Sequence, residues 1–440
     1  MGTIVLNMAV IVEIIFALYC IITKLNHEKF RSFIRIGALA AFVFFVLVPV
    51  IKWSFRWYGL ALLLLIWAVL GVWALVGRKP VKEYKPRTIV RRAIRGILLI
   101  LIALVPVLIF PQYQPPKVTG VHPVAAVTYT WTDPGRVETF TSKGGPTKIN
   151  VEFWYPGDGG GPYPLVVFSH GMLGIKISNT STFLELASNG YVVCSMDHPY
   201  NSLFTLDDSG HIAIINNAYL REYQDVNAGK YDEVTSMRLE QKWMRIRIAD
   251  INFVLNTILA GVIKSGSGAV YRIIDPGKIG LMGHSLGGES STQVARERND
   301  IAAVVNLDAD LAGEYVDYIS GKWTLNETPY PVPLLNIFSD TLERLMDAIP
   351  DSDKVIAVKH IIATVPQAYA IHLMGTDHMS FTDLPLVSPA LVRTINSSAP
   401  KAGGQEVNPL STIEKMNDLV LKFFNTYLKG EGSFSAAGTD

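Results

Sequence analysis

The stretch Lys278-Ile-Gly-Leu-Met-Gly283-His284-Ser285-Leu286-Gly287-Gly288 decides how the rest of this 440-residue chain is interpreted. It contains the pattern G-x-S-x-G between an apolar run typical of a buried strand and a run typical of a helix. In that context the serine lies on a sharp strand-to-helix turn, a nucleophile elbow. Gly283 and Gly287 fit the turn because a side chain two positions before or after the serine would collide with the chain. We therefore predict that Ser285 is a nucleophile.

A nucleophilic serine needs a general base, and the base needs an acid that orients it. After such an elbow the chain order is serine, acid, histidine. Of the three histidines after Ser285, His378 alone follows the last predicted strand. Catalytic groups gather at the carboxyl ends of parallel strands, so we predict His378 as the base. The acid stays open between Asp308 and Asp340, because each follows a predicted strand and either could reach His378.

An acyl-transfer site also needs N–H donors for the oxyanion. We expect one from the backbone of Leu286 and one from Met172, in the segment Phe168-Ser-His170-Gly171-Met172 after an early strand. His170 could be mistaken for a metal ligand together with Asp197 and His198. We interpret these residues as structural, and we predict no metal and no cofactor.

The pattern of elements around these residues predicts an α/β fold with a mostly parallel sheet flanked by helices. Residues 201–240 differ in composition from the rest and are interpreted equally as a lid over the acyl pocket or as a surface insertion. Predicted strands lie at residues 127–131, 149–154, 165–168, 191–196, 278–282, 302–307, 332–338 and 368–374, and predicted helices at residues 181–188, 237–259, 287–298 and 412–428.

Charge divides the chain into two physically different parts. Residues 1–117 contain fifteen Lys and Arg against three acids, a net charge of +12, whereas the remainder carries −11. The whole chain is 49% hydrophobic, with a mean hydropathy of +0.28. This composition excludes a disordered chain, a disulfide scaffold and a nucleic-acid binder organised by overall basicity.

Four apolar runs, at residues 4–22, 36–51, 57–76 and 96–110, predict four membrane spans, the second and fourth being short. We therefore divide the chain into a four-span domain (1–113), a linker (114–126), a catalytic domain (127–429) and a disordered tail (430–440). Glu13 is the one acid within a span, and we favour a carboxyl that faces the helix bundle over a proton or ligand site.

The orientation of the spans follows from lysine and arginine in the short loops. The second loop carries few basic residues, whereas the first and third carry many, so these two loops are expected in the cytoplasm. The catalytic domain is then expected on the extracytoplasmic side of the plasma (cytoplasmic) membrane. The basic residues of the first and third loops are Lys24, Lys29, Arg31, Arg35, Arg78, Lys79, Lys82, Lys85, Arg87, Arg91, Arg92 and Arg95.

Around the predicted site the chain resembles the plasma-type platelet-activating-factor acetylhydrolase (group VII phospholipase A2) branch of the α/β-hydrolase superfamily. The resemblance implies Ser285, Asp308 and His378 as a triad, with Met172 and Leu286 forming the oxyanion hole, and so favours Asp308 over Asp340. Family members act without a metal on esters with short or oxidised acyl groups. The segments that carry the resemblance, within residues 120–428, are Phe168-Ser-His-Gly-Met172, Met196-Asp-His-Pro, Gly283-His-Ser-Leu-Gly-Gly288, Leu307-Asp-Ala and His378-Met-Ser-Phe-Thr-Asp383.

Three features depart from the family pattern: the four N-terminal spans, residues 201–240 with a composition of their own, and Asp310, which stands where the family tends to have an aromatic residue. We expect a membrane-anchored serine esterase whose partners are membrane lipids and a lipid or amphiphilic ester substrate. The alternatives are a broad or cutinase-like carboxylesterase, an acyltransferase with a lipid or sugar acceptor, and a non-enzymatic membrane sensing or assembly module.

Overall fold

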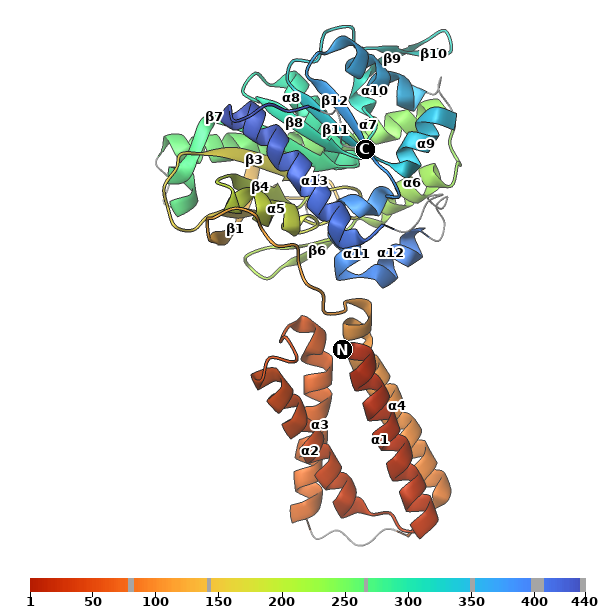
Figure 1. Ribbon diagram of the computed structural model, residues 1–440. Coiled ribbons are helices and arrows are strands. Elements are labelled where there is room, and N and C mark those ends of the chain that lie inside the picture. The colour runs from red at the N-terminus through yellow and green to blue at the C-terminus, as the bar shows by residue number, and fades with distance from the viewer. Residues whose placement is uncertain (78–82, 141–143, 265–267, 349–352, 397–406, 436–440) are drawn as a thin grey trace. The chain divides into compact units, whose positions relative to one another are not determined.

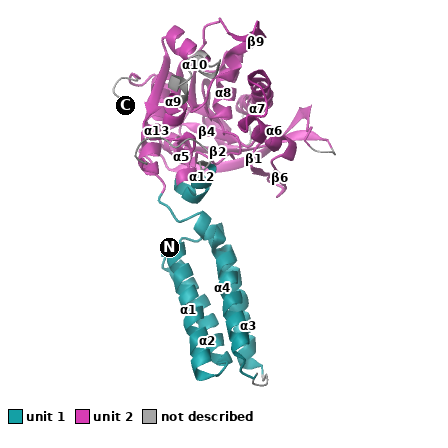
Figure 2. Cartoon of the chain, turned by 90° about the vertical axis from the view of Figure 1, so that its right-hand side faces the viewer, with its two compact units in different colours: residues 1–114, 386–398 teal, residues 115–385, 399–440 magenta. Residues whose placement is uncertain are grey.

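The structure is a computed structural model that describes residues 1–77, 83–140, 144–264, 268–348, 353–396 and 407–435. The chain divides into two compact units, coloured separately in Figure 2. The first comprises residues 1–114 and 386–398, and the second residues 115–385 and 399–440. Residues 386–398, which the sequence analysis places in the catalytic domain, thus group with the N-terminal helices.

Four helices of the N-terminal unit are each long and apolar enough to cross a membrane, by length and composition. Large apolar side chains such as Leu62, Trp73 and Ile102 are more than half exposed. An apolar surface this extensive is unfavourable in water and suits a lipid environment. The helices are α1 (Gly2–Thr23), α2 (Glu28–Leu47), α3 (Tyr58–Val76) and α4 (Pro86–Ile109).

Helices α2 and α4 are longer than the apolar runs that predicted them. Both begin in basic stretches that the hydropathy pattern left outside the spans, and Lys and Arg are good helix formers, so the helices extend through them. Helix α1 packs mainly against α4, and α2 packs against α3. A Cβ atom placed on Gly96 of α4 would lie 3.2 Å from the carboxyl carbon of Glu13. Glu13 therefore faces a neighbouring helix, and its role stays a prediction.

The second unit is built on an eight-stranded sheet with the order β1-β2-β4-β3-β7-β8-β11-β12 (Figure 1). Strand β2 pairs antiparallel with both β1 and β4, and the strands from β4 to β12 are parallel. The strands are β1 (Val124–Val137), β2 (Pro146–Pro156), β3 (Tyr163–Ser169), β4 (Val192–Met196), β7 (Ile274–His284), β8 (Ala303–Leu307), β11 (Leu334–Ser339) and β12 (Ala368–Leu373).

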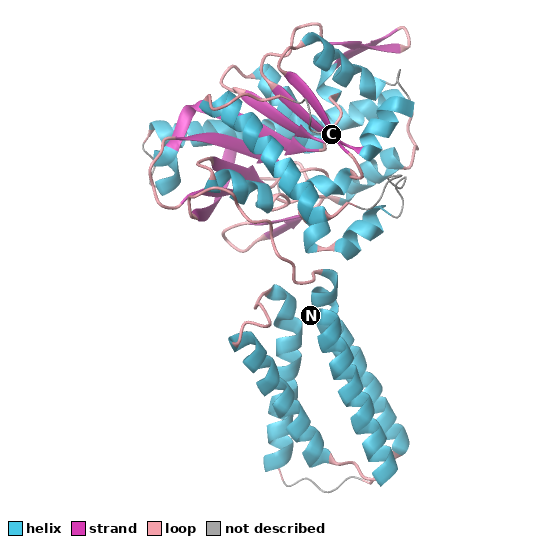
Figure 3. Cartoon of the chain, viewed as in Figure 1, coloured by secondary structure: helices cyan, strands magenta, loops and turns pink. Residues whose placement is uncertain are grey.

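Helices cover both faces of this sheet, as Figure 3 shows. Side chains from one face pack with α7 (Glu233–Ile263), α8 (Leu286–Glu297) and α10 (Asp353–Thr364). The opposite face packs with α5 (Thr180–Ser188) and α13 (Pro409–Phe424). The central strands are buried on both sides, which explains why their sequences are continuous apolar runs instead of alternating patterns.

Helix α7 also meets the length and composition criteria for a membrane span. Its apolar side chains Trp243, Ile251 and Leu255 are nevertheless buried against the sheet, while Lys242 and Arg245 are exposed. This division into an apolar and a charged face is typical of a helix that covers a sheet. We therefore interpret α7 as part of the α/β unit.

Residues 201–240 form a hairpin of β5 (Phe204–Leu206) and β6 (Ile212–Ile214), helix α6 (Asn217–Asn227) and the start of α7. Phe204, Leu206, Ile212 and Ile214 share the exposed face of the hairpin. Whether this segment moves as a lid stays a prediction. Other elements that the sequence did not predict are α10 and the shorter β9 (Tyr315–Ile319), β10 (Lys322–Leu325), α9 (Asp340–Ala348), α11 (Leu384–Val387) and α12 (Pro389–Asn396).

The C-terminal tail, predicted as disordered over 430–440, is described as far as residue 435. Within it Phe434 packs against Tyr369 and Phe423, with ring centroids 5.0 and 5.3 Å apart. An aromatic contact of this kind with the core fixes a short tail against the domain. Residues 436–440 lie outside the described residues.

Replacing Gly280 of β7 by valine should destabilise the α/β unit. A Cβ at Gly280 would lie 2.8 Å from Phe424 and 2.9 Å from Leu428, so the closing helix α13 would be pushed away from the sheet. Overpacking of this kind costs ~1–3 kcal/mol. Denaturant unfolding in detergent measures the loss, and Gly277→Ala, whose Cβ would approach only Asp275, is the control. Equal stability of the two variants would contradict the packing described.

Candidate active site

Ser285 lies at the turn between β7 and α8 in a strained backbone conformation, with φ 54° and ψ −133°. A Cβ on Gly283 would lie 2.2 Å from the carbonyl oxygen of Gly287, and a Cβ on Gly287 would lie 2.0 Å from that of Ser169. Neither position tolerates a side chain, because the atoms in the way are backbone. Strain at a non-glycine residue persists only where its surroundings enforce it, and it concentrates at functional sites. This is the geometry that the G-x-S-x-G pattern predicts.

His378 lies in the loop after β12 and forms a hydrogen bond with Asp308, which follows β8. The distance from His378 Nδ1 to Asp308 Oδ2 is 2.7 Å. Asp308 is buried and has a positive φ of 52°, and it also accepts bonds from the backbone N–H and the hydroxyl of Ser339 at 2.6 and 3.0 Å. Asp340, the other candidate acid, bonds with His372 and Arg344. The structure thus pairs His378 with Asp308.

These contacts change the pKa values of both groups. Burial disfavours the charged form of His378, but the hydrogen bond and the negative charge of Asp308 outweigh it, so the pKa of His378 lies above its ordinary value. Burial acts to raise the pKa of Asp308, yet the bond and charge of His378 and the Ser339 N–H hold it below its ordinary value. Asp308 therefore stays ionised at neutral pH and favours the protonated form of His378.

The elbow and the His378 loop meet through His284, the residue before Ser285. The His284 and His378 rings lie 4.6 Å apart, and His284 Nε2 is 2.9 Å from the backbone oxygen of His378. A carbonyl oxygen only accepts hydrogen bonds, so His284 carries its proton on Nε2. Burial, followed by the charge of His378, lowers the pKa of His284 to about 3. His284 therefore stays neutral while it supports the loop that carries His378.

The loop after β3 lies against the elbow. A Cβ on Gly171 would lie 3.1 Å from Ser285 Cβ, so Met172 belongs to a loop in contact with Ser285. Leu286 is the first residue of α8, and N–H groups in the first turn of a helix have no acceptor within that helix. Both expected oxyanion donors thus come from backbone next to Ser285.

The histidines and the aspartate that could be mistaken for a metal site each have their own partners. His170 bonds with Gly171 O and Ser202, whereas His198 bonds with Asp250 and Ser169. Asp197 accepts hydrogen bonds from the backbone N–H and side-chain amine of Lys176. Burial lowers the pKa of both histidines well below the ordinary value, so both are neutral structural residues.

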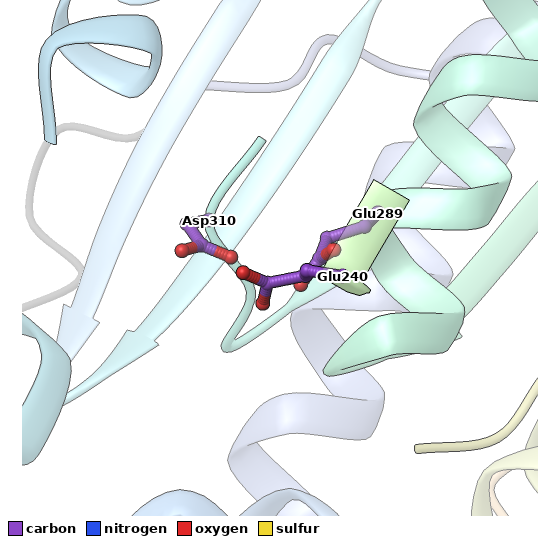
Figure 4. Close-up of side chains that lie close together, drawn as sticks. All are labelled: Glu240, Glu289 and Asp310. Atoms are coloured by element: carbon purple, nitrogen blue, oxygen red, sulfur yellow. The ribbon is translucent and has the colours of Figure 1, made fainter. Parts of the chain in front are cut away.

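Three carboxylates gather beside the site: Glu240 of α7, Glu289 of α8 and Asp310 after β8 (Figure 4). One oxygen from each lies within 4.8 Å of the others. The charge of Asp310 contributes to the raised pKa of His378, and the charge of Glu289 acts on Arg247. An acidic cluster alone does not identify a metal site. The negative charges of this cluster instead act on two charged groups near the elbow, His378 and Arg247.

Sequence reasoning missed three residues that support the site: His284, Ser339 and Arg247. His284 lies inside the serine motif, and Ser339 ends a predicted strand, so their positions were signals that we did not use. Arg247 follows Trp243 and Met244 at helical spacing and lies with them on the buried face of α7. A charged residue on an apolar helix face is such a signal, because it requires buried partners.

A family model described as "Platelet-activating factor acetylhydrolase, isoform II" matches residues 111–437. The chain belongs to this family. The match covers the α/β unit and leaves helices α1 to α4 outside, so the resemblance inferred from the active-site segments is confirmed. The matched residues include the serine motif, Asp308 and the loop that carries His378.

The relatives cover only part of the chain. Platelet-activating factor acetylhydrolase of Canis lupus familiaris is 25% identical over 248 residues, 53% of this chain and 51% of the relative. A probable 1-alkyl-2-acetylglycerophosphocholine esterase of Arthroderma benhamiae is 27% identical over 154 residues, 35% of this chain and 33% of the relative. The chain thus spans about half the length of the canine relative.

A solved structure confirms the predicted fold class. Ferulic acid esterase from Streptomyces cinnamoneus superposes with a TM-score of 0.54 and 21% identity, covering 72% of this chain and 93% of that structure. At this identity the likeness shows the fold alone. The acetylhydrolase-family chain therefore has an α/β-hydrolase fold, preceded by four apolar helices that are long enough to span a membrane.

Replacing Gly287 by alanine should disrupt the elbow. The new Cβ would overlap the backbone oxygens of Ser169 and His170, so α8 could not keep its place against β3. We expect a loss of at least ~2 kcal/mol of unfolding free energy, in the range for steric conflict in a core. Ser290→Ala, one turn further along α8, is the control for denaturant unfolding. A Gly287→Ala protein as stable as this control would contradict the predicted close contact.

Proposed function

We propose that this chain is a serine ester hydrolase that acts on lipid-like esters. Ser285 Oγ attacks the ester carbonyl while His378 Nε2 accepts its proton and Asp308 orients the ring. The N–H groups of Met172 and Leu286 stabilise the oxyanion of the tetrahedral intermediate. His378 then protonates the leaving alcohol, and in the second half it activates a water that releases the acyl group from Ser285.

The observations that carry this proposal are the 2.7 Å contact between Asp308 and His378 and the strained backbone of Ser285. An ionised, buried carboxylate fixes His378 with its proton on Nδ1, which leaves Nε2 free to act as a base. The contact between His284 and His378 supports the same arrangement, because it links the elbow to the loop that carries the base.

The substrate class is inferred from the family and from the apolar N-terminal helices. The canine relative is named for platelet-activating factor and the fungal relative for a 1-alkyl-2-acetylglycerophosphocholine, which supports a phospholipid or similar amphiphilic ester with a short or modified acyl group. Four spans would hold the domain close to a bilayer, which raises the effective concentration of a substrate within it. Membrane lipids are thus the proposed partners of the helical unit.

The sidedness of the proposed membrane protein rests on the basic residues. Residues 24–35 carry four Lys and Arg and residues 78–95 carry eight, whereas the second loop carries only Lys52 and Arg56. The positive-inside rule then places the α/β unit on the extracytoplasmic side. Protease protection in sealed cells tests this, because an intracellular α/β unit would be shielded from added protease.

Ser285→Ala should abolish ester turnover and labelling by a fluorophosphonate, which reacts with activated serines. The protein is assayed in bilayer mimetics against phospholipid classes, soluble esters and possible acyl acceptors, with Ser290→Ala as the matched control. Free acid released from lipid esters supports the proposal. Preference for soluble esters would indicate a general carboxylesterase, and formation of an acylated acceptor would indicate an acyltransferase. Absence of labelling in the wild-type protein would indicate a non-enzymatic module. Wild-type turnover by Ser285→Ala would refute the nucleophile.

Asp308→Asn should lower kcat by ~10⁴-fold, the scale seen when a triad carboxylate is replaced. Because Asp308 raises the pKa of His378, the acid limb of kcat/KM should lie above the ordinary histidine value of ~6.5 in the wild type and move to lower pH in this variant. Asp340→Asn should leave the limb in place. The reverse ranking of the two variants in a pH–rate series would transfer the acid role to Asp340.

A further inference from the structure

Helix α7 carries a buried arginine that the proposed mechanism does not use. The side chain of Arg247 has no exposed surface, and Met244, Ile248 and Ile251 beside it are buried in the core. Burying a charge costs several kcal/mol unless hydrogen bonds and opposite charges compensate. The partners of Arg247 therefore indicate what its charge is for.

The guanidinium donates to the backbone oxygens of two consecutive residues in the loop after β3. One nitrogen, Nη1, bonds with His170 O, and the other, Nη2, lies 3.3 Å from Gly171 O. The negative charges of Asp250 and Glu289 also act on Arg247 and offset part of the cost of its burial. Two donors on one rigid, planar group hold two adjacent peptide units in a fixed relation.

Gly171 O has further donors that hold it in the same direction. The Gly174 N–H lies 3.0 Å away and His170 Nδ1 lies 2.7 Å away. Because a carbonyl only accepts, His170 is protonated on Nδ1, and its Nε2 accepts from Ser202 at 2.8 Å. Arg247 is the one cation among these donors, and charge-assisted hydrogen bonds are roughly twice as strong as neutral ones.

The orientation of this carbonyl decides where the next N–H points. In a trans peptide the C=O of one residue and the N–H of the next point in opposite directions. Donors that draw Gly171 O toward α7 therefore direct the Met172 N–H away from α7. Gly171 itself lies against Ser285, as the 3.1 Å approach of an added Cβ shows. The peptide that Arg247 holds is thus the one expected to supply the second oxyanion donor.

We propose that Arg247 is a positioning residue that keeps the peptide between Gly171 and Met172 in the orientation in which the Met172 N–H serves the oxyanion hole. The inference rests on the proposed hydrolase function and adds the residue that preorganises one of its donors. Arg247 does not touch the substrate. Its effect falls on the transition state, because an oxyanion donor acts mainly on charge that develops during the reaction.

The test compares Arg247→Met and Arg247→Lys with the wild type, using the full chain in nanodiscs. Arg245→Met is the matched control, because Arg245 lies on the exposed face of the same helix. Each protein hydrolyses an ester and the thionoester with the same acyl and leaving groups. Sulfur is larger and accepts weaker hydrogen bonds than oxygen, so an ordered oxyanion hole prefers the ester.

Arg247→Met should lower kcat for the ester by ~10²–10³-fold, as when one oxyanion donor is lost, with KM changed far less. The rate ratio of ester to thionoester should fall by at least ~tenfold, and Arg247→Lys should recover part of both quantities because it keeps the charge and one donor. Arg245→Met should match the wild type. A purely structural role would lower the amount of active protein without changing this ratio.

An unchanged ratio in Arg247→Met overturns the proposal, whatever happens to kcat. If Arg247→Met does not fold, Arg247→Lys decides: an intermediate ratio supports the proposal and a wild-type ratio refutes it. The proposed function fails separately, when the wild type neither turns over esters nor reacts with a fluorophosphonate. In that case the inference about Arg247 fails together with the proposed function. If the wild type is active and Arg247→Met keeps the wild-type ratio of ester to thionoester rates, only the inference about Arg247 fails.

Discussion

The close approach of three backbone segments at the elbow is the constraint on which the rest of the α/β unit depends. The chain leaves β7, turns at Ser285 and enters α8 so tightly that Gly283 and Gly287 have no room for a Cβ. This contact fixes α8 against β3, and it brings the loop after β3 to Ser285. The sheet on either side then sets where Asp308 and His378 emerge, since both follow parallel strands that end at the same edge.

The sequence was most informative where a single residue type is the only one that fits. Glycine on either side of Ser285, a histidine after the last strand and continuous apolar runs for buried strands each have a direct physical cause, and all of these elements are present. Two acids remained equivalent in sequence because both follow strands. Choosing between them required the resemblance, and the structure distinguishes them through partners from distant segments, Ser339 and His378 for Asp308 and His372 for Asp340.

What the sequence left out depends on contacts between segments far apart in the chain. Arg247 bonds with residues 76 and 77 positions away, and no local pattern on α7 encodes that contact. The hairpins and short helices between the sheet strands were missed because their exposed side chains carry little periodic signal. Helices α2 and α4 were predicted too short because an apolar run ends at the first charged residues. The helices themselves continue through these residues, since Lys and Arg are good helix formers.

The edge of the sheet that carries His378 also carries a second carboxylate–imidazole pair, Asp340 with His372, on the neighbouring strands. In evolutionary terms, Asp340 is a second carboxylate that is already present at this edge of the sheet. A descendant that lost the carboxylate after β8 would still have one after β11, at the end of the adjacent strand in the same sheet. Migration of the acid from one strand to the next would then begin from an existing side chain, with the framework around the nucleophile unchanged.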